Sequence, residues 1–88
     1  MTLTIDGILC QTPKQTHDYL HSILELPDYY GSNADALFDA LMTIHTPLNI
    51  IIINADALQD TLGDYGETLL KVFTAINTKN PRIKVTIM

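Results

Sequence analysis

The sequence predicts one small α/β domain, residues 1–88, in which three parallel strands pair in the order 1-2-3 and about four helices connect them. The central observation is the apolar, mostly β-branched run Leu48–Ile53, which is typical of a strand buried on both faces of a parallel sheet. The segments 2–6 and 83–87 instead alternate with polar residues, so the apolar run is expected at the centre. Each connection is long enough for a crossover, and crossovers between parallel strands are right-handed.

The chain begins with a predicted strand at residues 2–6, which ends on an Asp-Gly turn signal. Thr12 and the proline after it are typical of a helix cap followed by proline at the first helical position. Apolar and aromatic side chains at helical spacing extend this first helix to about Glu25, and Pro27 closes it.

A second helix follows, and either Ser32 or Asn33 is expected to cap it. The apolar stripe of this helix consists of Ala34, Leu37, Phe38 and Leu41. The segment from 43 to 47 is expected to be a loop that leads into the central strand.

The second crossover is predicted to contain two helices. Residues 54–62 suit a short helix that Gly63 ends, and residues 64 to about 78 suit a longer one with a regular apolar side. Pro81 separates this helix from the last strand, in which apolar residues alternate from 83 to 87. The short helix is the candidate to cover the second face of the sheet.

Charge is segregated along the chain, which has ten acidic and five basic residues and a net charge of −5. Residues 15–70 contain nine acids and no lysine or arginine, whereas residues 71–88 sum to +4. Such a surface repels nucleic acid, so direct DNA or RNA binding is not expected. The repulsion among the acids is tolerable if the face they form receives a strongly basic partner.

Cysteine usage and hydropathy favour a cytoplasmic protein. Cys10 is alone, so it cannot form an internal disulfide, and the role of a small buried apolar residue is expected for it. The first residues show neither the basic nor the apolar region of a signal peptide. The longest apolar run is much too short to span a bilayer, so no membrane association is expected.

The stretch LPDYYGSNADALFDAL, residues 26–41, carries the main functional signal. At about 100° per residue, Asp35 and Asp39 fall in one sector of the helix with Met42, opposite the apolar stripe. Asp35 lies in the first turn, where the helix dipole stabilises an anion. Asp39 is a poor helix former in mid-helix and is repelled by Asp35, so folding gives no reason for it.

Two tyrosines precede that helix. Tyr29 and Tyr30 are adjacent in a loop, so at most one of them is expected to be fully packed. Tyrosine next to carboxylates on a rigid helix end is a common composition of protein interfaces. Taken residue by residue, a solvated helix face with half-buried tyrosines is the better interpretation. Taken together with the missing lysines and arginines, an interface becomes the better one.

The same stretch resembles the signature of the barstar family, small intracellular inhibitors of barnase-type ribonucleases. The family pattern is Leu-Pro-acid-Tyr-Tyr-Gly, then Asn, then a helix with two acids flanking an aromatic residue. The matching positions are Leu26, Pro27, Asp28, Tyr29, Tyr30, Gly31, Asn33, Asp35, Ala36, Leu37, Asp39 and Leu41. The last predicted helix also fits at Gly66, Glu67, Val72 and Phe73, and the likeness covers nearly the whole chain.

The resemblance implies a protein that plugs the active site of a basic microbial ribonuclease as a 1:1 complex. Asp39 would then stand in for an RNA phosphate and accept charge-assisted hydrogen bonds from arginine, lysine and histidine of the nuclease. Asp35 and the backbone from Gly31 to Asn33 would contact the rim and the catalytic histidine, against which Tyr29 would pack. The full set of expected partner-binding residues is Tyr29, Tyr30, Gly31, Asn33, Asp35, Phe38, Asp39, Met42 and Ile44.

The chain departs from the family pattern around this centre. Phe38 stands where a tryptophan is usual, and Met42 and Ile44 replace a hydroxyl and an aromatic residue. Thr74 and Ala75 occupy the region where a further partner-facing acid is expected. The central acid is kept while its periphery is altered, which gives the hypothesis that the partner is related to barnase but differs from it at the rim.

An enzyme is the first alternative. Asp35 and Asp39 begin a divalent-metal site, but no further ligand, phosphate-binding glycine loop or nucleophile accompanies them. His17 and His21 lack the cysteine or third histidine of a zinc site, and solvated helix positions account for them better. We therefore expect no catalytic residue, metal or cofactor. The second alternative is an acidic regulatory module that binds a basic protein without nuclease activity.

Overall fold

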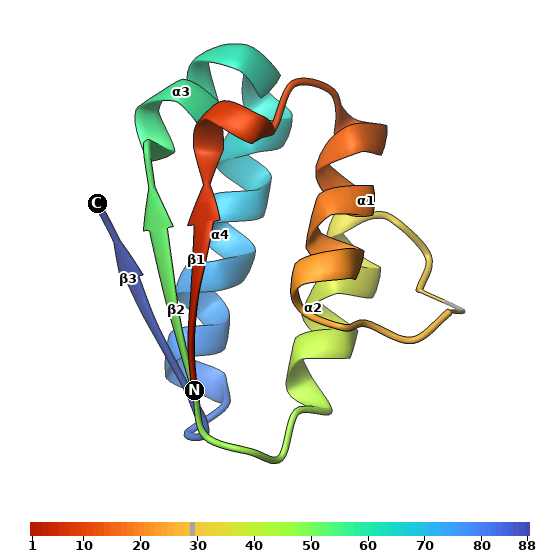
Figure 1. Ribbon diagram of the computed structural model, residues 1–88, viewed down its shortest axis with the longest axis vertical. Coiled ribbons are helices and arrows are strands. Elements are labelled where there is room, and N and C mark those ends of the chain that lie inside the picture. Colours follow the sequence, from red (N-terminus) through yellow and green to blue (C-terminus); the bar gives the residue numbers. More distant parts are fainter. Residues whose placement is uncertain (29) are drawn as a thin grey trace.

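The computed structural model describes residues 1–28 and 30–88, and its three strands form a parallel sheet in the order β1-β2-β3, as predicted. In chain order the elements are β1 (Thr2–Asp6), the 3-10 helix η1 (Gly7–Leu9), α1 (Pro13–Ile23), α2 (Ala34–Met42), β2 (Leu48–Ile53), α3 (Ala55–Leu62), α4 (Asp64–Lys79) and β3 (Ile83–Ile87). Figure 1 shows α4 alongside the sheet, α1 and α2 beyond it, and α3 at the end where β1 and β2 finish.

The core lies between one face of the sheet and the helices α1, α2 and α4. Ile5 of β1 pairs with Ile52 of β2, and neither is more than 1% exposed. Leu20, Leu37 and Phe73 belong to the same buried cluster and come from α1, α2 and α4 respectively. Each of these helices therefore buries one side in the core and has exposed residues on the opposite side.

The other face of the sheet is open, which corrects the expectation that Leu48–Ile53 is buried on both faces. Burial alternates along β2: Ile50 and Ile52 are fully buried, whereas Asn49 is exposed and Ile51 is half-buried. The reason is topological. Two right-handed crossovers that proceed in the same direction place their connecting helices on the same side of the sheet.

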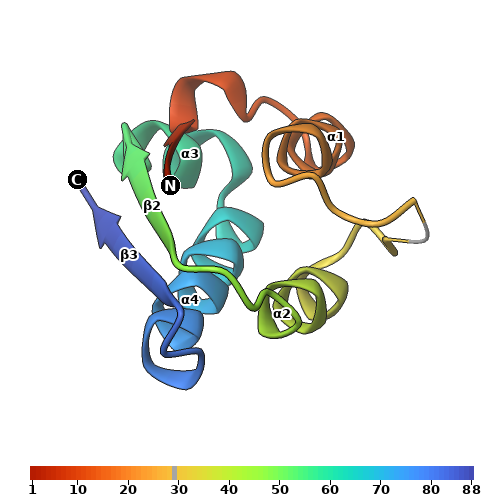
Figure 2. The same ribbon diagram turned by 60° about the horizontal axis from the view of Figure 1, so that its bottom comes forward.

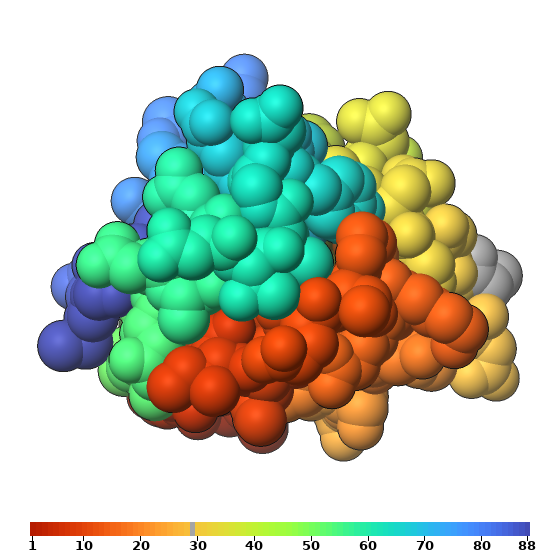
Figure 3. All heavy atoms as spheres, turned by 90° about the horizontal axis from the view of Figure 1, so that it is seen from above, coloured from red at the N-terminus to blue at the C-terminus, as the bar shows by residue number. Residues whose placement is uncertain are grey.

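The short helix α3 does not cover that open face. It packs against α4 and η1, and Figure 3 shows η1 and α3 side by side. Two glycines permit this close packing, because a Cβ on Gly7 would lie 2.1 Å from the carbonyl oxygen of Asn54, and a Cβ on Gly66 would lie 2.8 Å from that of Leu58. The predicted Asp-Gly turn is thus the point at which η1 meets the start of α3.

The helix boundaries follow the predicted capping signals with two adjustments. The Thr12 hydroxyl caps α1 and accepts a backbone N–H from its first turn at 3.1 Å. This helix ends at Ile23 rather than near Glu25, because the backbone becomes left-handed at Glu25, with φ of 53°. Of the two candidate caps of α2, Asn33 is the one used, since its Oδ1 accepts the Ala36 N–H at 2.8 Å.

Asn80, next to the predicted break at Pro81, also holds the end of α2 in place. Its side chain is buried, and its Nδ2 donates to the carbonyl oxygens of Leu41 at 2.9 Å and Ile44 at 3.2 Å. Its Oδ1 accepts the backbone N–H of Arg82 at 3.0 Å. The C-terminal end of α2 is thereby tied to the turn before β3.

At both edges of the sheet, a side chain accepts a hydrogen bond from a backbone N–H group. At the outer edge of β1, the Asp6 N–H donates to the Tyr19 hydroxyl at 3.1 Å. At the outer edge of β3, the Val85 N–H donates to the Asn77 Oδ1 at 2.8 Å. Each edge strand therefore offers one donor fewer to another chain.

Candidate protein-binding site

The exposed face of α2 carries the acids that the helix period predicts to lie together. Leu37 and Leu41 are fully buried and fix the opposite side of the helix in the core. Asp35 and Asp39 are exposed, and Met42 on the same side is 41% exposed. The helix thus presents two carboxylates and a flexible apolar side chain to solvent.

Asp39 has no ion-pair partner within residues 1–28 and 30–88. The ion pairs in that part of the chain join successive turns of other helices, Lys14 with Asp18 at 2.9 Å and Lys71 with Glu67 at 3.5 Å. The charge of Asp39 is therefore not neutralised within the described fold and is available to a cationic group from outside.

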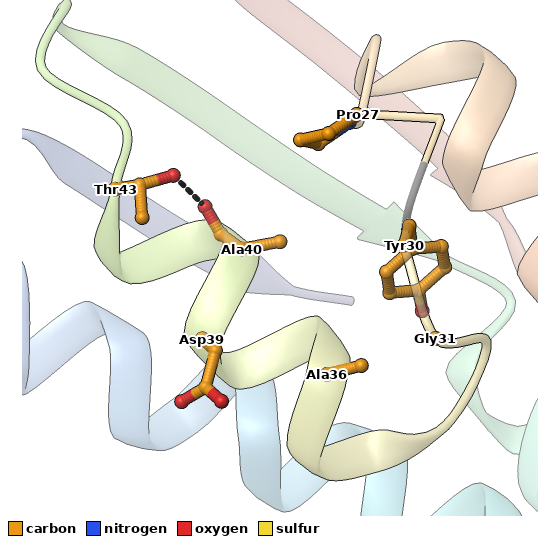
Figure 4. A pocket seen from close by; sticks show the side chains of 7 residues that line it. All are labelled: Pro27, Tyr30, Gly31, Ala36, Asp39, Ala40 and Thr43. Carbon is orange, nitrogen blue, oxygen red and sulfur yellow. Dashed lines mark hydrogen bonds between the residues drawn. The ribbon is translucent and has the colours of Figure 1, made fainter.

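A pocket of about 230 Å³ lies between α2 and the loop before it (Figure 4). It is lined by Pro27, Tyr30, Gly31, Ala36, Asp39, Ala40 and Thr43. The short side chains of Ala36 and Ala40 point from α2 toward the loop and leave this space open (Figure 4). A mostly apolar pocket with a carboxylate at its edge suits a side chain that has an apolar or aromatic body and a cationic end.

Local hydrogen bonds shape the loop of residues 27–33. The Tyr30 N–H donates to the carbonyl oxygen of Pro27 at 2.9 Å, which closes a turn. Asn33 joins the loop to α2, because its Nδ2 donates to the carbonyl oxygen of Gly31 at 3.3 Å while its Oδ1 caps the helix. Gly31 and Asn33, both expected to contact a partner, are exposed.

Tyr30 is only partly exposed, because residues of the helix α1 contact both its hydroxyl and its ring. Its hydroxyl is hydrogen-bonded to Nδ1 of His17. Its ring stacks on that of His21, with the ring centroids 6.2 Å apart and 2° between the planes. Burial raises the pKa of the Tyr30 phenol above its usual value of 10. The part of Tyr30 that lines the pocket beside Asp39 stays open to a partner.

His17 is 1% exposed, which corrects the expectation that it and His21 are solvated. Its Nδ1 is hydrogen-bonded to the hydroxyl of Tyr30 and its Nε2 to that of Tyr65. A histidine is tolerated in a core when both ring nitrogens are satisfied in this way. His21 is half-buried beneath Tyr30. A usable signal was present in the sequence, because His17 lies three positions before the core residue Leu20 and thus on the same side of α1.

The buried imidazole of His17 makes the stability of the fold depend on pH. Burial lowers the pKa of His17 below its usual value of 6.5, and the neighbouring Asp18 opposes this effect only in part. As the pH falls below about 6.5, the unfolded chain therefore binds a proton before the folded chain does. We expect the free energy of unfolding, measured by urea titration, to be fully maintained above about pH 7 and to decrease between about pH 6.5 and pH 5.

The variant His17→Gln is the control for this pH dependence. Glutamine does not titrate, so the slope of the free energy of unfolding against pH should be smaller in the variant over the same range. A wild-type stability that stays constant from about pH 7 to pH 5 would show that the folded and unfolded chains bind protons equally at His17.

The structure brings most of the predicted contact residues together. Tyr30, Gly31 and Asp39 meet at the pocket. Asn33 and Asp35 adjoin it at the start of α2, and Met42 continues the same side of that helix. The predicted surface is thus one continuous strip from the loop along α2.

Two of the other predicted residues lie differently. Phe38 is partly buried against the core, as its position at the border of the apolar stripe predicts. Ile44 also packs against the core, and it lines a separate hollow of about 250 Å³ with Met1 and Leu3 rather than the pocket beside Asp39. Tyr29 lies outside the described residues.

Further features of the described residues bear on the alternatives. Within residues 1–28 and 30–88, no three histidine, cysteine, aspartate or glutamate side chains are grouped so that they could hold a metal ion. None of the helices in that part of the chain is long and apolar enough to cross a membrane. Cys10 is fully buried, as predicted, and its thiol donates to the carbonyl oxygen of Asp6 at 3.7 Å.

The fold and this surface define a class, the small acidic α/β domains that expose an acid, unpaired within residues 1–28 and 30–88, beside a side-chain-sized pocket. Comparison with known proteins identifies the family within this class. Residues 1–88 match the model of the family described as Barstar (barnase inhibitor), and the chain belongs to that family. Over 71 residues it is 37% identical to a Bacillus subtilis (strain 168) protein described as "Putative ribonuclease inhibitor YrdF"; the match covers 80% of this chain and 78% of that protein.

Family membership confirms the resemblance predicted from the motif at residues 26–41. It also identifies the chain as an inhibitor rather than an enzyme, and the partner that it implies is a ribonuclease. The acids of α2 and the pocket beside them form the candidate surface for that inhibition.

Proposed function

We propose that this protein inhibits a barnase-type ribonuclease by inserting the acidic face of α2 into the nuclease active site. The observation that supports this most directly is Asp39, an exposed acid in mid-helix that lies at the edge of the pocket and has no ion-pair partner among the described residues. Neither helix propensity nor a neighbouring charge explains its presence. In the complex its carboxylate takes the place of an RNA phosphate and accepts charge-assisted hydrogen bonds from arginine, lysine and histidine of the nuclease.

Residues near Asp39 make the remaining contacts with the nuclease. The pocket receives one cationic side chain of the nuclease, whose apolar or aromatic body packs on Tyr30. Asp35 and the backbone from Gly31 to Asn33 contact the rim of the active site, and Tyr29 packs against the catalytic histidine. The outer contacts are made by Phe38, Met42 and Ile44, where this chain departs from the family pattern.

The distribution of charge favours fast association with a basic enzyme. No lysine or arginine occurs from residue 15 to residue 70, and four of the five bases lie at position 71 or later, on α4, the following turn and β3. In Figure 2, α4 separates α2 from β3. A basic nuclease is therefore steered toward the acidic side of the molecule. We propose that one inhibitor binds one nuclease in the cytoplasm, where free nuclease would degrade cellular RNA.

A capture and inhibition experiment tests this function. The tagged protein captures its partner from a lysate of its own cells at low salt, and the captured protein is then titrated with inhibitor while RNA cleavage is followed. We expect a basic ribonuclease that loses its activity at an equimolar ratio. Capture of a non-nuclease protein alone, or RNA cleavage that is unchanged by excess inhibitor, would contradict the proposal and favour an acidic regulatory module.

A further inference from the structure

His17 connects three parts of the fold that are far apart in the sequence. It lies on α1, and its ring nitrogens are hydrogen-bonded to the hydroxyl of Tyr30, before α2, and to that of Tyr65, at the start of α4. We propose that His17 and Tyr65 are positioning residues for the partner-binding site: together they hold Tyr30, and through it one wall of the pocket. This inference rests on the proposed inhibitor function.

The rings of this cluster are packed as well as hydrogen-bonded. The centroids of His17 and Tyr30 lie 5.6 Å apart with 53° between the ring planes, and those of His17 and Tyr65 lie 5.7 Å apart with 67° between the planes. His21, one turn further along α1, stacks on Tyr30. Tyr30 is thus in contact with two histidines of one helix, and only the first of them is linked onward to α4.

Hydrogen-bond chemistry makes both tyrosines necessary. A neutral imidazole has one donor and one acceptor nitrogen, whereas a phenol hydroxyl serves in either role. His17 is therefore satisfied when one tyrosine donates to it and the other accepts from it. Without the Tyr65 hydroxyl, Nε2 of His17 would be a buried polar atom that lacks its partner, which lowers the stability of the buried arrangement in which His17 holds Tyr30.

Among the described residues of its loop, Tyr30 is hydrogen-bonded through its side chain to the helix α1. The hydrogen bonds of Pro27 with Tyr30 and of Gly31 with Asn33 stay within the loop and the helix cap. Among the described residues from 27 to 33, Tyr30 is the one whose side chain is hydrogen-bonded to a helix other than α2. If it is released, the pocket loses the wall that faces Ala36 and Ala40.

The helix α4, which carries Tyr65, is held firmly in the fold and can therefore position His17 and Tyr30. Phe73 and Ile76 are at most 2% exposed and anchor the helix in the core. Gly66, next to Tyr65, packs directly against the backbone of α3 at Leu58. The ring of Tyr65 packs against the core, and the loss of the hydroxyl alone keeps that ring in place.

The variant Tyr65→Phe tests the inference because it removes the hydroxyl alone. In the free protein we expect faster amide hydrogen exchange at Tyr30 and Gly31. The dissociation constant for the ribonuclease should rise about tenfold, since a loop that is competent about a tenth of the time lowers the apparent affinity by that fraction. The control is Tyr19→Phe, which removes a hydroxyl that accepts the Asp6 N–H at the edge of β1 and should change neither quantity.

Unchanged loop exchange together with an unchanged dissociation constant in Tyr65→Phe would overturn the inference. A higher dissociation constant with unchanged loop exchange would overturn it too, because Tyr65 would then contact the nuclease itself. Tyr30→Phe cuts the same link from the loop side and should produce the same rise in exchange, so the test does not depend on one variant. If the wild-type protein inhibits no ribonuclease, the proposed function fails, whereas the exchange measurement still decides whether Tyr65 positions the loop.

Discussion

Asp39→Ala is expected to weaken binding to the ribonuclease roughly a hundredfold or more while leaving the fold as stable as before. Removal of one member of a buried charge pair costs about 3–5 kcal/mol, because the opposing cations stay buried and unpaired. At about 1.4 kcal/mol for each factor of ten, the dissociation constant rises roughly 100- to 3,000-fold. In the free protein Asp39 is exposed, so its loss should not lower the free energy of unfolding. Calorimetric titration and urea unfolding measure the two quantities.

The matched control is Asp60→Ala, which removes an exposed acid of the same charge from α3. Its expected effect is limited to a modestly slower association, since a distant charge contributes to steering but not to the contact. A dissociation constant that is unchanged in Asp39→Ala would remove the central support for the phosphate-mimic mechanism. So would a lower stability of that variant with normal binding.

Leu41→Ala is expected to lower the free energy of unfolding by about 2–5 kcal/mol, the usual cost of deleting a fully buried leucine side chain. Leu41 is fully buried beneath the acidic face of α2, so the truncation leaves a cavity under the helix that carries Asp39. The side chain does not reach the surface, and the folded fraction of the variant should still inhibit the nuclease at an equimolar ratio. Urea unfolding followed by an inhibition titration measures both effects.

Met42→Ala is the control for this stability change, because Met42 follows Leu41 directly but is 41% exposed. Its expected cost is about 0.5 kcal/mol or less, which is usual for a surface substitution. If the two variants lost the same stability, α2 would not be anchored through Leu41 as described. Together with Asp39→Ala, the pair separates the side of α2 that binds from the side that folds.

The order and type of the elements are predictable because their signals are local. Pro13 starts α1, Asn33 caps α2 and the alternation within β1 is visible in a few residues. The open face of the sheet is not local in this sense. A run of isoleucines fits both a fully buried and a half-open strand, and the choice between them depends on which side of the sheet the two crossovers take.

Some features of the candidate site are likewise predictable from local sequence, and others depend on the fold. The exposure of Asp39 follows from the helix period, which needs only the positions of Leu37 and Leu41. The burial of His17 depends on two hydroxyls that lie 13 and 48 positions away in the sequence, and only the folded chain brings them together. Ile44 was expected at the interface from its place in the family pattern; in the structure it is partly buried against the core, and its contact with a partner stays a prediction.

The occupied sheet edges bear on how the inhibitor behaves at high copy number. If one inhibitor binds one nuclease, as we propose, the inhibitor has to be at least as abundant as its target. At such concentrations an unprotected outer strand is a template for a strand of a neighbouring molecule, and growth from it ends in polymers. Because Tyr19 occupies the Asp6 N–H and Asn77 occupies the Val85 N–H, a strand that pairs along the full length of either edge must first break an existing hydrogen bond. The same hydrogen bonds that complete the fold therefore oppose polymerisation and help to keep the stock of inhibitor in its active, dispersed form.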